Sequence, residues 1–243
     1  MTIKINYKNS TPKKSLASLV LFTDEKFNLQ HLKKTLTNFE FSYINDLLKT
    51  GDLKKRKLYL FELSSKKKIV LVAIKKNIKT FEIENLGAEL YGRINYGKDC
   101  EYCIHAESIV SKKENFVGHF LHGLMLKSYE FNKYKTKKET RIVTLTVIGN
   151  KNKTSTASLL KFKALEEGTF YARDLVSEPG NVLHPDEYAK RINSLKKHGL
   201  KVNVYDNKRL KKLGMNALLG VGQGSVRGSY LVTMEWNGAK NNS

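Results

Sequence analysis

The chain has 243 residues, and 40% hydrophobic and 10% aromatic side chains are enough for one large or two smaller packed domains rather than a disordered polymer. Its net charge of +21 comes mostly from Lys, because only seven of the 44 basic residues are Arg. Dedicated nucleic-acid surfaces usually depend on Arg, so we interpret this charge as a solvated surface that binds polyanions weakly and nonspecifically.

No apolar run approaches the length needed to cross a bilayer, so we expect no membrane partner. The first eight residues contain no apolar signal region, which predicts a cytoplasmic protein. Two cysteines, Cys100 and Cys103, are too few for a disulfide scaffold.

The first 150 residues alternate β-type runs with helical patterns. Apolar runs predict strands over residues 16–22, 58–63, 69–74, 102–106 and 141–148, with a polar turn over 64–68. Helical spacing of apolar side chains predicts helices over 41–49, 81–94 and 116–129. Such alternation is typical of an α/β sandwich, which we place at residues 1–150.

A polar link over 150–156 leads to a second group of elements. A long helix is predicted over 157–177, and Pro185 opens another helix that ends near 198–199. Strands are predicted over 201–205, 217–221 and 230–236, with a short helix over 207–213. We therefore expect a linking helix at 151–179 and the incomplete start of a second α/β domain at 180–243.

Two pairs of residues have spacings that could bind a metal ion. Cys100 and Cys103, with His105 nearby, fit a zinc or dithiol site, but they lack a second ligand pair at the usual spacing. His119 and His122 share a helix face, but no acidic residue neighbours them in sequence. We interpret both pairs as structural and expect no metal ion bound by this chain.

Residues 220–224, Gly-Val-Gly-Gln-Gly, resemble a phosphate-binding loop. The Lys and Ser/Thr of a Walker loop are missing, so we interpret the segment as a bend that leaves a strand. No Gly-x-Ser-x-Gly elbow and no carboxylate pair stands out. The residue patterns therefore predict no catalytic, cofactor-binding or metal-binding residue.

Four ordered segments resemble the leucyl (cytosol) aminopeptidase family. Residues 172–189, A-R-D-L-V-S-E-P-G-N-V-L-H-P-D-E-Y-A, are similar to the opening of its catalytic domain, with mild departures at Ser177 and Gly180. Residues 213–225, L-G-M-N-A-L-L-G-V-G-Q-G-S, and 231–238 are similar to the next family segment and the strand after it. Residues 116–135 are similar to a helix of the N-terminal domain, and the first hundred residues match loosely.

This resemblance implies a macro-like α/β/α N-terminal domain, a linking helix and the start of a catalytic domain. Family enzymes form hexamers and remove N-terminal residues, often Leu, from peptides. They use two divalent metal ions, Zn or Mn, which polarise the scissile carbonyl and activate water. The first metal-ligating Lys of the family lies in a G-K-G-x-x-F-D segment just after the strand that 230–236 matches, and the sequence ends before it.

The resemblance thus implies the N-terminal portion of a metal-dependent aminopeptidase, inactive as 243 residues alone, with no catalytic or metal residue to assign to this chain. Two other function classes stay open: a binding or regulatory module, since macro-like domains can bind nucleotides and some family members bind DNA, and an assembly scaffold. Residues 1–150 show no Gly-rich phosphate loop beside an acidic or Asn-rich site, which argues against nucleotide binding there.

Overall fold

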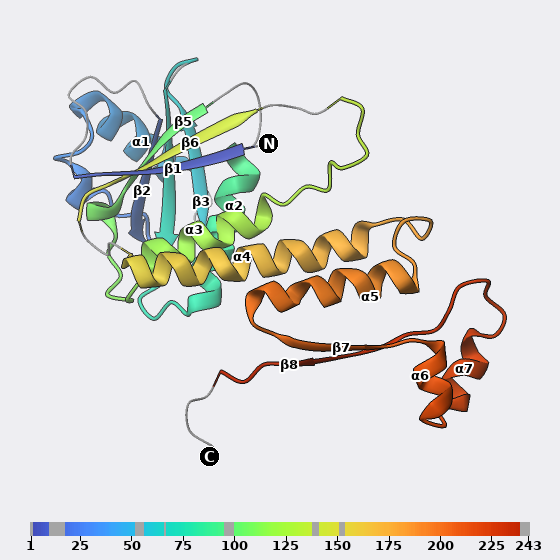
Figure 1. Cartoon of the computed structure of the whole chain (residues 1–243). Helices are drawn as coiled ribbons and strands as arrows, with labels where there is room; N and C mark the ends of the chain where they lie inside the picture. The colour runs from blue at the N-terminus through green and yellow to red at the C-terminus, as the bar shows by residue number, and fades with distance from the viewer. Residues whose placement is uncertain are drawn as a thin grey trace. The chain divides into compact units, whose positions relative to one another are not determined.

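A computed structural model describes residues 2–9, 18–51, 56–65, 67–94, 100–137, 141–150 and 154–238 (Figure 1). They form two compact units, Met1–Ala172 and Arg173–Ser243, and the boundary lies within the helix α4 (Thr156–Ser177). Positions 16–17 of the first predicted strand, Lys66 of the predicted turn and 151–153 of the predicted link lie outside the described residues. The division at 150 and 179 stays a prediction.

The N-terminal unit is built on a six-stranded sheet in the order β1-β6-β5-β2-β4-β3. Its strands are β1 (Thr2–Lys8), β2 (Ser18–Asp24), β3 (Leu58–Glu62), β4 (Lys68–Ile74), β5 (Cys100–His105) and β6 (Ile142–Ile148). All neighbouring pairs are parallel except β3 and β4, which form an antiparallel hairpin. The expected α/β class is confirmed, with a mixed sheet.

Alternate side chains of the strands enter two separate hydrophobic cores. Val20 and Phe22 of β2 pack on the face covered by α2 (Thr80–Ile94) and α3 (Phe116–Lys127). Leu19 and Leu21 pack on the other face, against α1 (Asn38–Thr50) and the short 3₁₀ helix η1 (Gln30–Leu32). Because central strands are buried on both faces, they read as continuous apolar runs in the sequence.

The start of α1 is fixed by a capping box. The Thr37 hydroxyl accepts a hydrogen bond from the Glu40 amide, and the Glu40 carboxylate accepts one from the Thr37 amide. Glu40 is buried and pairs with the Lys67 ammonium at 2.5 Å. Burial would raise the pKa of this carboxyl, but the bonds from Lys67 and Thr37 hold it below its usual value.

The helices α2 and α3 approach so closely that glycine is required at their contact. A Cβ atom on Gly87 would lie 1.8 Å from the Phe120 carbonyl oxygen, and one on Gly123 would lie 1.9 Å from that of Glu84. Both obstacles are backbone atoms of the opposite helix, so a side-chain rotation cannot relieve them. The contact brings Phe116 and Phe120 onto Phe22 of the sheet, with ring centroids 5.5 and 5.2 Å away.

The first part of α4 packs on α3 around Phe162. A Cβ on Gly118 would lie 2.5 Å from the Phe162 ring, so the absence of a side chain there makes room for the ring. His119 and His122 of α3 lie beside the same ring, at centroid distances of 4.9 and 5.0 Å. α3 is therefore held on one side by α2 and on another by α4.

Each of these histidines has a carboxylate partner from a distant part of the sequence. His119 Nδ1 lies 2.9 Å from Glu84 Oε1 on α2, and His122 Nδ1 lies 2.9 Å from Glu166 Oε1 on α4. Burial raises the pKa of Glu166, although the bond and the charge of His122 oppose that shift. Burial raises the pKa of Tyr7, and the negative charge of the nearby Glu166 carboxylate raises it further.

The C-terminal unit continues from the end of α4 into a smaller set of elements. They are α5 (Pro185–Asn193), the 3₁₀ helix η4 (Ser194–His198), β7 (Lys201–Tyr205), α6 (Asn207–Lys212), α7 (Asn216–Gly222) and β8 (Leu231–Glu235). β7 and β8 form a two-stranded antiparallel ribbon. Among the described residues of this unit, the buried hydrophobic side chains are Ala189, Ile192, Val202 and Leu210.

Two of the sequence predictions differ from the structure. The strand predicted over 217–221 is wrong, because these residues belong to the helix α7. Ala and Leu favour helices, and a short apolar run does not distinguish the two states. The strand β1 was not predicted, although Ile3 and Ile5 alternate with polar residues and pack on the sheet core, as expected for an edge strand.

The substitution Gly123→Ala should destabilise the N-terminal unit by about 1–3 kcal/mol, because the added methyl group forces α2 and α3 apart. Gly92→Ala is the matched control, since a Cβ there has no neighbour within 4 Å and the helix α2 should gain about 0.5–1 kcal/mol. Thermal unfolding of the two variants should shift in opposite directions. Equal shifts would contradict the close contact of the helices.

The substitution Glu166→Gln should make stability less sensitive to pH. A carboxyl whose pKa is raised by folding favours the folded state when protonated, and this contribution is lost as the pH rises through the raised value. The wild type should therefore lose stability relative to the variant between about pH 4 and pH 7, as measured by urea unfolding. The exposed neighbour Glu167, changed to Gln, should leave the wild-type profile unchanged.

Candidate functional site

The two cysteines lie on β5 but face opposite sides of the sheet. Cys100 packs against the core that contains Tyr102, whereas Cys103 packs in the core on the other face. Side chains three positions apart along a strand point to opposite faces of the sheet, which explains why the two cysteines are separated. The two sulfur atoms are therefore not arranged to bind one metal ion or to form a disulfide bond with each other.

His105 is the last residue of β5. Its Nδ1 atom is buried and has no hydrogen-bond partner among the described residues. Burial lowers the pKa of this imidazole, which favours the neutral ring. The other histidines considered as metal ligands, His119 and His122, each bond a different glutamate. These glutamates lie 35 and 44 residues away in the sequence, so inspection of neighbouring residues does not find them.

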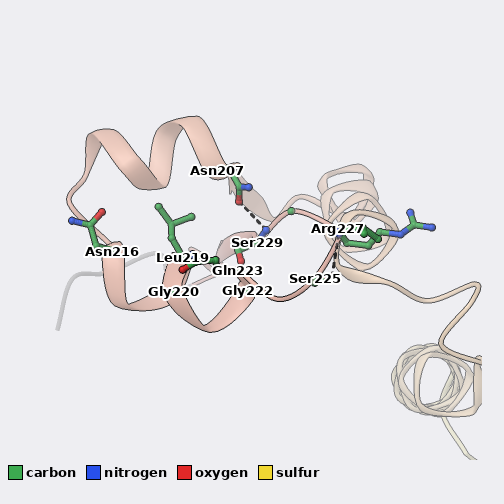
Figure 2. Close-up of a pocket in the computed structure, with 11 residues that line it drawn as sticks. Asn207, Asn216, Leu219, Gly220, Gly222, Gln223, Ser225, Arg227 and Ser229 are labelled. Carbon is green, nitrogen blue, oxygen red and sulfur yellow. Dashed lines mark hydrogen bonds between the residues drawn. The ribbon is translucent and has the colours of Figure 1, made fainter.

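The glycine-rich segment 220–224 borders a hollow of about 440 Å³ in the C-terminal unit (Figure 2). Gly220 and Gly222 end α7, so the segment leaves a helix and not the strand that was predicted. The hollow is lined by Asn207, Asn216, Leu219, Gly220, Gly222, Gln223, Ser225, Val226, Arg227, Gly228 and Ser229.

Asn207 ties the two sides of this hollow together. Its side-chain oxygen accepts a hydrogen bond from the Ser229 amide at 2.8 Å. A Cβ on Gly222 would lie 2.0 Å from the Ser229 hydroxyl, so glycine permits this close approach. Figure 2 shows the Arg227 side chain extending away from the hollow. The wall is consequently made of amides, hydroxyls and backbone, without a nucleophile paired to a base.

Arg227 instead joins a small polar cluster at the start of α5. His184 is the N-cap of that helix, and its Nδ1 contacts the Asp186 carboxylate. The Arg227 guanidinium lies 3.3 Å from both Asp186 Oδ2 and His184 Nδ1. Desolvation would raise the pKa of Asp186, but hydrogen bonds from its backbone amide and His184, with the charge of Arg227, hold it below its usual value.

This cluster contains one histidine and one carboxylate beside a cation, which is too few donors for a metal ion. Within the described part of the chain, no group of three or more His, Cys, Asp or Glu side chains is arranged to hold one. The described residues therefore do not fit a two-metal centre, and no step of catalysis is assigned to them. No described helix has the combination of length and hydrophobicity that a bilayer span requires.

Comparison with known proteins identifies relatives of part of the chain. Residues 170–243 match the family model described as "Cytosol aminopeptidase family, catalytic domain". A probable cytosol aminopeptidase from Brucella melitensis is 44% identical over 124 residues, which cover 49% of this chain and 26% of the relative. The aligned part is thus about a quarter of that relative's length.

Solved structures show the same fold over nearly the whole chain. A tomato leucine aminopeptidase superposes with a TM-score of 0.70 at 18% identity, covering 96% of this chain and 50% of the tomato chain. The bottromycin maturation enzyme BotP, in a complex with Mn, superposes with a TM-score of 0.66 at 17% identity over 92% of this chain and 46% of its own. The chain spans about half the length of these structures.

The family match covers the C-terminal unit, and the fold likeness extends through the six-stranded sheet. The segments that suggested a leucyl aminopeptidase from sequence are thereby confirmed as a family relationship. Residues 170–243 match the catalytic domain of the cytosol aminopeptidase family, and about half of the chain is similar to probable cytosol aminopeptidases.

Proposed function

We propose that these residues form the N-terminal domain and the opening of the catalytic domain of a metal-dependent aminopeptidase that releases N-terminal residues, Leu among them, from peptides. The observation that carries this proposal is the match of residues 170–243 to the family's catalytic domain. The 44% identity to a probable cytosol aminopeptidase supports the same assignment. The name of that relative also supports a cytoplasmic location.

In this proposal the N-terminal unit is macro-like, α4 links it to the catalytic domain, and the whole enzyme is a homo-hexamer. Two divalent ions, Mn or Zn, would supply the Lewis acid and the activated water. The Mn complex of BotP, which shares the fold, supports metal-dependent chemistry in such enzymes. Because the described residues do not provide a donor set for these ions, we place the ligands outside them.

A binding or regulatory module is the second candidate, and the net charge of +21 is the observation that favours it. Binding that arises from diffuse Lys should be weak and should fall steeply with salt, because it depends on counterion release. A sequence-specific footprint at physiological salt would instead support the regulatory function. An assembly scaffold would show neither peptidase activity nor a footprint.

A polypeptide of these 243 residues alone should not hydrolyse leucine p-nitroanilide when Mn²⁺ or Zn²⁺ is added. The reason is that a two-metal peptidase needs more carboxylate and Lys ligands than the described clusters provide. Release of p-nitroaniline is followed by absorbance, with a mock purification from the same host as the control for contaminating peptidases. Metal-dependent turnover above that control would contradict the assignment of the ligands outside this chain.

Amide hydrogen exchange should be slower in the N-terminal sheet than in the C-terminal unit. Strands β4 and β6 are covered on both faces, whereas Val221 and Trp236 are 88% and 66% exposed. A unit with few buried side chains opens locally at low free energy. Equal protection across β4, β6, α7 and β8 would mean that the C-terminal unit is a complete domain by itself.

A further inference from the structure

A second hollow of about 440 Å³ lies in the C-terminal unit, and we name it the α5–β7 hollow. Its lining combines apolar, amide and cationic side chains from α5, η4, β7, α6 and the residue before β8. The lining residues are Asp186, Ala189, Lys190, Asn193, Lys196, Val202, Asn203, Val204, Arg209 and Tyr230. All of them belong to the same compact unit, so the hollow is formed within it.

Helical periodicity explains why α5 presents several of these residues together. Asp186, Ala189, Lys190 and Asn193 are three or four positions apart, so they share one face of the helix. Ala189 and Val202 are 3% and 2% exposed, and they form an apolar floor where α5 packs on β7. Polar side chains surround an apolar base, as in many small-molecule sites.

Three cations line this hollow, and their charges are poorly neutralised by the described residues. Lys190 Nζ lies 3.8 Å from Glu187 Oε2, which is longer than a hydrogen bond, and the Lys196 side chain has no partner among the described residues. The Arg209 guanidinium is positioned by a 3.2 Å bond to the Val204 carbonyl oxygen, which satisfies one of its five donors.

Among the lining residues, Asp186 carries a carboxylate, and its charge is neutralised by partners outside the lining. Asp186 bonds His184 and pairs with Arg227, whose Nη1 lies 3.3 Å from Asp186 Oδ2. Asn193 and Tyr230 add uncharged donors, and neither side chain has a hydrogen-bond partner among the described residues. The hollow therefore combines three cations with two neutral donors around an apolar floor.

We propose that the α5–β7 hollow binds a small organic phosphate, with the phosphate held by Lys190, Lys196 and Arg209 and its apolar part lying on the floor beside Tyr230. A phosphate matches cations and neutral donors together, because its oxygen atoms accept several charge-assisted hydrogen bonds. The apolar floor would favour an organic ester over inorganic phosphate.

Phenyl phosphate is a suitable probe, because it carries one phosphate and one apolar ring. Calorimetric titration of the 243-residue chain should show saturable binding of phenyl phosphate, weaker binding of inorganic phosphate and still weaker binding of phenol. The double substitution Lys190→Gln and Lys196→Gln should weaken phenyl phosphate binding about tenfold or more, because hydrogen bonds to charged groups are lost.

The matched control is Lys208→Gln with Lys211→Gln, which removes the same charge from exposed positions of α6 outside the lining. This pair should change the affinity less than about threefold if binding is local, because exposed charges are screened over roughly 8–10 Å. Circular dichroism verifies that both variants fold. Arg209→Lys, which keeps the charge but not the planar donors, should weaken binding by an intermediate amount.

Three outcomes would overturn the proposal. Equal losses in the two double variants would show that the affinity comes from the diffuse charge of the chain. Stronger binding of inorganic phosphate than of phenyl phosphate would remove the role of the apolar floor. A DNA duplex of mixed sequence could displace phenyl phosphate from both the wild type and the Lys190/Lys196 double variant with the same affinity. That result would place the phosphate contacts elsewhere on the surface.

Discussion

The contact between the backbones of α2 and α3 is the constraint on which the N-terminal unit depends. At Gly87 and Gly123 each helix meets a carbonyl group of the other, so the two helices act as one layer over the sheet. That layer presents Phe116 and Phe120 to Phe22, at the centre of the core. The same helix α3 then carries Gly118, His119 and His122 on its far side, where Phe162 of α4 packs. A change at the glycine contact would therefore reach α4 through α3, because close-packed interiors transmit displacement.

Much of the fold could be predicted because buried strands and amphipathic helices leave local signals. The apolar runs that became β3 and β4, and the helical spacing of α2 and α3, depend on which faces are buried, and neighbouring residues report that directly. The edge strand β1 was missed because half of its side chains are polar, and α7 was predicted as a strand because so short an apolar run has no clear period. The glycine contact was also invisible, since a glycine within a helix is read locally as a weakness and its reason lies in another helix.

The candidate sites also divide into features that the sequence predicts and features that only the structure reveals. Counting along β5 is sufficient to place Cys100 and Cys103 on opposite faces once the strand is known. The glutamates that bond His119 and His122 cannot be found by local inspection, because they come from helices 35 and 44 residues away. The family relationship was predicted from segments between 116 and 238, and it was accessible from sequence because it rests on ordered motifs and not on a three-dimensional cluster. The lining of the α5–β7 hollow comes from four elements and Tyr230, so no single sequence motif predicts it.

The total positive charge of this chain and the positions of its cationic side chains carry different information about anion binding. A net charge of +21 produces a long-range attraction for any polyanion, and it does so wherever the Lys residues lie. Selective binding requires donors that converge on one volume and are not already engaged by neighbouring groups. Several described ion pairs of this protein are exposed, such as Lys49 with Asp46 and Lys201 with Glu235, and water competes with such pairs. The cations of the α5–β7 hollow are exposed as well, with 81% of the Lys190 side chain accessible, but the apolar floor beside them excludes water from one side of an anion bound there and strengthens the attraction at short range. Local geometry and not total charge therefore determines whether this surface distinguishes one anion from another.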